Sequence, residues 1–259
     1  MSDDEPVIDD FDDPSGREVG SAEDRPDVIE HYRAEEVTLL FRLKRLAARA
    51  AGSALTSALL ALIIFPLLVL GIITINLPAT LFDGWTSNPG LRPSLWLSRG
   101  DLVLGATLLV LILMTRRHGG AIAARALGFA WILLLFVTVI FLLYRAPELT
   151  AGDFPNGRVV IGLVAGWYGA GWIAIRVYDL TRGSRWYRPP FLALMCGFVF
   201  QSLVTLPVTY VGTGLPWNWW LGANVVIQTC LTVIYVAVYR LLRVRFHPRA
   251  TSVTGYGGQ

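Results

Sequence analysis

The sequence predicts an all-α membrane protein whose core is a bundle of six transmembrane helices. The 259 residues are 54% hydrophobic, with a mean hydropathy of +0.54, which is too apolar for a soluble domain. The apolar residues are gathered in blocks, most of them long enough to cross a bilayer at about 1.5 Å of rise per residue. Arginine is concentrated in alternate connections between these blocks, as expected when a chain crosses the membrane repeatedly.

The N-terminal segment is acidic and precedes the apolar blocks. Fourteen of the 19 acidic residues lie before Val37, together with only three arginines. Residues 1–26 lack an apolar period, so we expect a disordered tail that is not a signal peptide. Residues 27–50 repeat apolar side chains near a 3.6-residue period and end in basic residues, which predicts an amphipathic juxtamembrane helix. Residues 51–243 then form the transmembrane domain, and residues 244–259 form a flexible C-terminal tail.

Six apolar segments are expected to span the membrane. They are Ala54–Ile75, Leu102–Met114, Ala126–Tyr144, Val159–Tyr178, Phe191–Val211 and Leu221–Tyr239. Pro66 should kink the first of them. The second is too short to cross alone, so it either extends through Leu95–Gly100 or enters the membrane only part-way.

The loop charges predict the orientation. Basic residues cluster before the first span, between the second and third, between the fourth and fifth, and after the sixth. By the positive-inside rule both termini are cytoplasmic, and we expect a multi-pass protein of the cell membrane. The isoelectric point near 9.0 reflects these arginines and does not indicate a nucleic-acid partner. Cys196 and Cys230 lie within apolar runs, so we expect small buried side chains and no disulfide.

No residue pattern typical of an enzyme is present, so we expect no catalytic residues, no metal and no cofactor. His31, His118 and His247 are not spaced with Cys, Asp or Glu as metal ligands would be. No nucleophile–base pattern and no phosphate-binding loop occurs. Asp101 and Asp179 lie at the edges of apolar segments, so no carboxylate is expected at mid-span, where proton-driven transporters usually carry one.

The polar groups expected at depth are neutral. We expect a substrate-binding site formed by Gln201, Ser202, Trp167, Asn224 and Gln228. An indole face and several amides could hold a flat, uncharged molecule that forms hydrogen bonds. The same residues could instead hold helices together, and Gln201 is open to both interpretations. Trp172 offers a second aromatic surface.

The fourth span contains four closely spaced glycines, Gly162, Gly166, Gly169 and Gly171. We interpret them as a surface against which another helix packs, because small residues let helices approach closely in a membrane.

Four stretches of the sequence match, in order and spacing, the motifs of a known family of membrane proteins. They are Ile112–Gly119 followed by Arg125 and Gly128-Phe129; Leu163, Gly166, Trp167, Gly171 and Ala174; Gly197, Gln201, Ser202, Tyr210 and Gly212-Thr213; and Asn224, Val225, Gln228 and Tyr239. From Leu95 to Arg243 this layout resembles the vitamin uptake transporter-like family, which includes the queuosine precursor (7-cyano-7-deazaguanine) transporters. The chain lacks most of the polar residues of the family's motifs. Where the family has acidic residues this chain has Ile112, Arg116, Ala174 and Gln201, and where the family has a lysine it has Gln228.

The resemblance implies a six-helix permease for a small neutral molecule, such as a vitamin or a 7-deazapurine (queuosine) precursor. The alternative is a non-transporting membrane scaffold that recruits a cytoplasmic protein through its acidic N-terminal tail. A deep cavity reaching Gln201, Trp167 and Gln228 would favour the permease, and a bundle packed shut at mid-depth would favour the scaffold. The partners expected are membrane lipid, a small-molecule substrate and a cytoplasmic protein, but no nucleic acid.

Overall fold

A computed structural model describes residues 39–145 and 156–246, which are helical and contain no β-strand. The chain divides into two units, Met1–Arg49 and Ala50–Gln259. The acidic tail, most of the juxtamembrane segment and the C-terminal tail beyond Phe246 lie outside the described residues.

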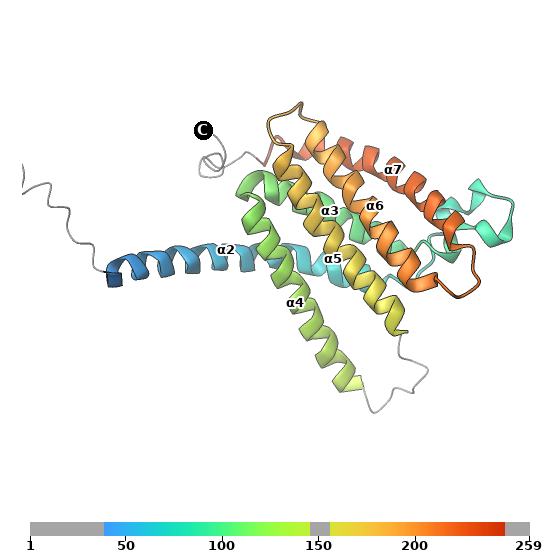
Figure 1. The fold of residues 1–259 in the computed structure, drawn as a ribbon, viewed down its shortest axis with the longest axis horizontal. Coiled ribbons are helices and arrows are strands. Elements are labelled where there is room, and N and C mark those ends of the chain that lie inside the picture. The colour runs from blue at the N-terminus through green and yellow to red at the C-terminus, as the bar shows by residue number, and fades with distance from the viewer. Residues whose placement is uncertain (1–38, 146–155, 247–259) are drawn as a thin grey trace, which may run out of the picture. The chain divides into compact units, whose positions relative to one another are not determined.

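Six long helices make up the described chain (Figure 1). They are α2 (Leu39–Ile73), α3 (Arg99–His118), α4 (Gly120–Arg145), α5 (Gly157–Leu180), α6 (Arg188–Tyr210) and α7 (Trp217–Leu242). Three short 3-10 turns, η2 (Thr80–Trp85), η3 (Pro89–Leu91) and η4 (Pro93–Leu95), connect α2 to α3. Among the described residues, five segments are long and apolar enough to cross a membrane: Ala51–Ile73 of α2, and α4 to α7. The fold is therefore that of a multi-pass membrane protein.

Helix α2 begins at Leu39, inside the stretch expected to form the juxtamembrane helix, and continues without a break to Ile73. Pro66 lies within it.

Helix α3 forms the centre of the bundle. Its 20 residues extend about 30 Å, and it packs against α4, α5, α6 and α7. Leu104, Leu108, Leu111 and Ile112 are almost completely buried. Because α3 carries charged residues in both its first and its last turn, it does not count among the five apolar spans.

The start of α3 is tied to the end of α2. The amide of Arg99 donates to the carbonyl of Leu77 (2.7 Å), and the amide of Gly100 donates to that of Thr74 (3.1 Å). The backbone of Gly100 lies so close to the carbonyl of Gly71 that no Cβ atom would fit between them. The two helices therefore come close enough for backbone contact at this point, and the side chain of Leu104 packs against Gly71 beside it.

The connection between α2 and α3 packs against α6 and α7. Its apolar side chains share a buried cluster with residues of those two helices: Ala79, Trp96, Leu97, Leu206, Trp220 and Ile227. The indole of Trp220 also donates to the carbonyl of Gly90 (3.2 Å). Only part of the irregular segment is covered in this way, because Leu81 and Leu95 of the same connection are exposed.

Three of the four glycines pack α5 against α6, and Gly171 packs against Leu111 of α3 and Leu127 of α4, which confirms that the cluster is a packing surface. A Cβ atom on Gly162 would lie 3.0 Å from Thr209 Oγ1, and one on Gly169 would collide with the ring of Phe200. A Cβ atom on Gly166 would overlap the hydroxyl of Thr205, which itself donates to the carbonyl of Gly162 (3.0 Å).

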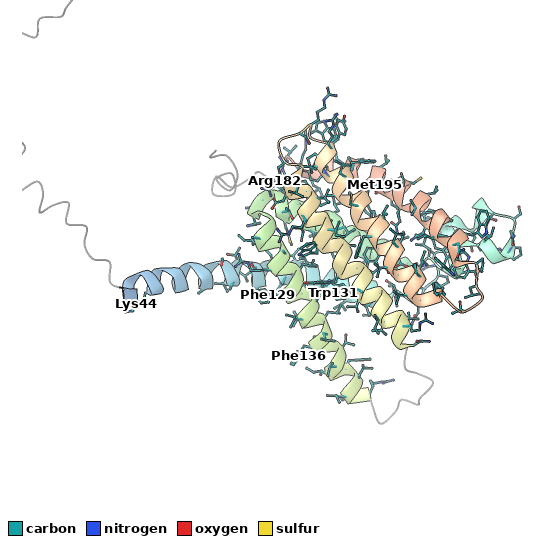
Figure 2. The ribbon with its side chains drawn as sticks, viewed as in Figure 1. Lys44, Phe129, Trp131, Phe136, Arg182 and Met195 are labelled. Carbon is teal, nitrogen blue, oxygen red and sulfur yellow. The ribbon has the colours of Figure 1, made fainter. Side chains whose placement is uncertain are left out.

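Helix α4 leaves the bundle towards its C-terminal end (Figure 1). Its buried residues all precede Phe136, the last of them being Leu134. Phe129 and Phe136 point away from the bundle, whereas Trp131 lies towards α5 (Figure 2), with its ring edge-on to that of Tyr168 at 6.3 Å. The exposed apolar half of α4 is a surface suited to lipid.

The expectation that both cysteines are buried is wrong. Cys196 and Cys230 are exposed on α6 and α7 and are not joined by a disulfide. In a membrane, the outward face of a helix is as apolar as its inward face, so an apolar run does not predict burial.

Candidate functional site

The expected site residues of α5, α6 and α7 lie at a similar level in the bundle. The start of α5 lies beside the end of α6, since the guanidinium of Arg158 donates to the carbonyl of Val211 (3.0 Å). Trp167 lies about 15 Å along α5 from that end, Ser202 about 12 Å along α6, and Asn224 about 10 Å along α7. These depths place the three residues well inside the bundle, between about a quarter and just under half of the way along their helices.

A serine and an asparagine join α6 to α7. The amide nitrogen of Asn224 donates to the hydroxyl of Ser202 at 2.8 Å, and both residues are buried. Ser202 also donates to the carbonyl of Phe198 (2.9 Å). Gln201, which is 3% exposed, has its two polar contacts on its own helix, each at 3.4 Å, with Thr205 and Ser202. Ser202, not Gln201, therefore makes the interhelical hydrogen bond.

Helix α7 holds unpaired amide atoms in the interior. Asn224 Oδ1 and both amide atoms of Gln228 have no hydrogen-bond partner in the described part of the chain. Asn224 is 4% exposed and Gln228 is 2% exposed. They are four residues apart, so both side chains lie on one face of α7. An unpaired buried polar group costs about 1–3 kcal/mol, so this face gains stability from any bound molecule that forms hydrogen bonds with it.

Asp101 is a site residue that the sequence analysis missed. It lies in the first turn of α3, where it accepts hydrogen bonds from the amide (3.0 Å) and hydroxyl (2.8 Å) of Ser98 in a capping box. Its other carboxylate oxygen accepts a hydrogen bond from the indole of Trp167 (3.3 Å). Because Trp167 lies near the middle of α5, a carboxylate at the edge of an apolar segment is also at mid-depth in the bundle. Asp101 thus lies at the edge of its own helix, as expected, but level with residues near the middle of α5.

Aromatic side chains lie next to these polar groups. The ring of Trp167 is edge-on to Phe198 (6.4 Å), and Phe198 is stacked with Tyr235 of α7 (6.0 Å). Trp172, expected as a second aromatic surface at depth, does not contribute. It is 46% exposed and carries the guanidinium of Arg176 over its ring at 5.2 Å, so it faces outward.

The polar cluster is closed in this conformation, because all five expected site residues are buried. An open pocket of about 320 Å³ lies beside the first turn of α3, and it is lined by Ala79, Thr80, Leu81, Arg99 and Leu102. None of the five expected residues lines this pocket. The bundle is packed shut around them, which is the arrangement expected of the scaffold, and it is the unpaired amide atoms of α7 that favour a permease instead. Within residues 39–145 and 156–246, no group of His, Cys, Asp and Glu is placed to hold a metal ion.

The opposite end of the bundle is joined by arginine and tyrosine. Arg116 of α3 donates to the phenol oxygen of Tyr239 (3.2 Å), which shares a hydrogen bond with Tyr178 of α5 (2.8 Å). Arg182 donates to the carbonyl of Thr115 at the end of α3. We call this the arginine-rich end. Figure 2 shows Arg182 here, where α5 gives way to the loop that leads to α6.

No family model matches the chain, and neither a curated protein nor a solved structure shows significant similarity to it.

Proposed function

We propose that this membrane protein is a permease for a small, uncharged molecule that forms several hydrogen bonds. The observation that carries the proposal is the unpaired amide face of Asn224 and Gln228, buried at mid-depth beside the Ser202–Asn224 hydrogen bond. Leucine at both positions would fill this space without the cost of unpaired polar atoms, so a bound ligand is the simplest reason for keeping amides there.

The substrate class follows from the groups around the amides. Each amide presents donors and an acceptor side by side, which complement the edge of a base or a lactam. Trp167 and Phe198 add flat aromatic surfaces, and Asp101 Oδ1 keeps a second lone pair that a ligand N–H group could use. The resemblance in layout to the queuosine precursor transporters makes a 7-deazapurine or a vitamin the first candidate.

We further propose that α3 and the segment before it make a sixth crossing, with both termini in the cytoplasm. Helix α3 reaches the arginine-rich end, where Thr115 and Arg182 meet. Its first turn lies level with the middle of α5, so the segment before it would complete the crossing through its buried residues Ala79, Trp96 and Leu97, which pack against α6 and α7. A helix that begins at mid-membrane is a common way to build a transporter site, because its polar first turn then faces the substrate.

Uptake in cells tests the proposal. Cells that lack their own carrier for 7-cyano-7-deazaguanine, expressing this protein, should accumulate the labelled base above vector controls. A panel of labelled neutral bases and vitamins extends the test. If the protein reaches the membrane but no member of the panel is accumulated, the scaffold alternative replaces the permease.

A further inference from the structure

Four arginines surround two exposed aromatic residues at the arginine-rich end. The guanidinium groups of Arg240 and Arg243, in the last turn of α7 and just after it, lie 5.5 Å and 4.7 Å from the centre of the Trp186 ring. Both charges are therefore held beside one indole, although like charges repel each other. The set, called here the arginine–aromatic platform, consists of Arg185, Trp186, Tyr187, Arg188, Arg240 and Arg243.

Tyr187 extends the same arrangement along the loop between α5 and α6. Its ring lies edge-on to that of Trp186, with the centres 5.8 Å apart. Hydrogen bonds from Arg188 and Arg185 hold the pKa of the Tyr187 phenol below its usual value. Trp186 is 39% exposed and Tyr187 is 40% exposed, so the surface is accessible in the described chain.

No carboxylate of the described residues balances these charges. Residues 39–145 and 156–246 contain three acidic side chains, Asp83, Asp101 and Asp179. Asp83 lies in η2 and Asp101 in the first turn of α3, both remote from the arginine-rich end, and Asp179 pairs with Arg182 at 3.0 Å. An anion that meets the arginines of the platform is therefore drawn to charge that no carboxylate of the described residues neutralises.

We propose that the arginine–aromatic platform binds the phosphate headgroup of an anionic phospholipid. The platform lies where apolar helices α5, α6 and α7 end, at the level at which a bilayer places its headgroups. Tryptophan and tyrosine favour this interface, and arginine forms paired hydrogen bonds with phosphate oxygens. This proposal needs only the membrane fold and does not depend on transport.

Native mass spectrometry of the full chain, purified free of lipid in detergent, tests the proposal. Phosphatidylglycerol is titrated as the probe, with zwitterionic phosphatidylcholine as the headgroup control and soluble glycerol phosphate as the control without acyl chains. The variant Arg240→Gln/Arg243→Gln removes both charges at Trp186. The matched control is Arg176→Gln, because Arg176 also lies over an exposed indole, that of Trp172.

The wild type should bind phosphatidylglycerol more tightly than phosphatidylcholine, and glycerol phosphate should bind neither variant nor wild type. Each interfacial arginine contributes about fivefold, so the double variant should lose about 25-fold in affinity for phosphatidylglycerol. Arg176→Gln should bind as the wild type does.

Equal lipid binding by the double variant and the wild type overturns the proposal, as does an equal loss in Arg176→Gln. Equal affinity for phosphatidylcholine or for glycerol phosphate overturns the assignment to an anionic lipid. Unfolding temperatures of the variants show whether any loss reflects misfolding, and the single variant Arg240→Gln, with an expected fivefold loss, then replaces the double one.

Discussion

The indole N–H of Trp167, near the middle of α5, donates a 3.3 Å hydrogen bond to the carboxylate of Asp101 in the first turn of α3. This contact places the beginning of one helix at the midpoint of another. It also brings a carboxylate close to the aromatic rings that line the proposed site. The same carboxylate caps α3 through Ser98, so it has a structural role whether or not a ligand binds.

A double-mutant cycle measures the Asp101–Trp167 contact. Asp101→Ala removes the cap and the interhelical acceptor, and should cost about 1–2 kcal/mol of unfolding free energy in mixed micelles. Trp167→Phe keeps a ring against Phe198 but removes the donor. The coupling energy between the two changes should be about 0.6 kcal/mol, the average for hydrogen bonds between membrane helices. Strictly additive effects would show that the bond contributes nothing.

Ser202→Ala should destabilise the protein more than Gln201→Leu. Ser202 accepts the 2.8 Å hydrogen bond that joins α7 to α6, and its loss leaves the amide nitrogen of Asn224 unpaired, at a cost of about 1 kcal/mol. Gln201 has only two 3.4 Å contacts on its own helix, so leucine should change stability by less than about 0.5 kcal/mol. Thermal unfolding in detergent compares the two. A larger loss in Gln201→Leu would restore the interpretation of Gln201 as an interhelical contact.

Gly166→Ala should destabilise the α5–α6 contact. The new methyl group would collide with the hydroxyl of Thr205 and displace its hydrogen bond to Gly162, so we expect a loss of about 1–3 kcal/mol. Gly222→Ala is the matched control, because a Cβ atom at Gly222 meets nothing within 4 Å. In that control, alanine should leave the unfolding temperature unchanged or raise it. Equal effects at both sites would contradict the packing role of Gly166.

The proposed orientation is tested by cysteine labelling. Cysteine at Thr213, in the turn between α6 and α7, should react with an impermeant thiol reagent added outside cells, and cysteine at Ser184 should not. Cys196 and Cys230 are replaced by alanine first, because both are exposed. The reverse labelling pattern would place the termini outside.

The positions of the helices were predictable because uncharged apolar blocks have clear ends. The expected span Phe191–Val211 and helix α6 (Arg188–Tyr210) differ by three residues at one end and one at the other. The second apolar block was harder, because its helix begins at Arg99 and includes charges that hydropathy assigns to a loop.

The composition of the site was only partly predictable. The five expected site residues are buried because placing amides, hydroxyls and an indole N–H in lipid is costly. They are Gln201, Ser202, Trp167, Asn224 and Gln228. The contact between Asp101 and Trp167 could not be predicted from the sequence. It depends on how far α3 is shifted along α5, and no local sequence pattern determines that shift. The outward direction of Trp172 was also missed, although Arg176, four residues later on the same face of α5, marks that face as exposed.

The central claim is that the unpaired amides on α7 bind a transported molecule, and uptake into proteoliposomes tests it most directly. Vesicles containing purified protein should accumulate labelled 7-cyano-7-deazaguanine, or a neutral base chosen from the cell screen, above protein-free vesicles. Gln228→Leu should reduce this uptake at least tenfold, about 1.4 kcal/mol, because the ligand loses its amide partner. Its thermal stability should stay the same or rise, because the wild-type amide is unpaired without a ligand. Unchanged uptake in a well-folded Gln228→Leu variant, or wild-type vesicles no better than protein-free ones across the panel, would contradict the account.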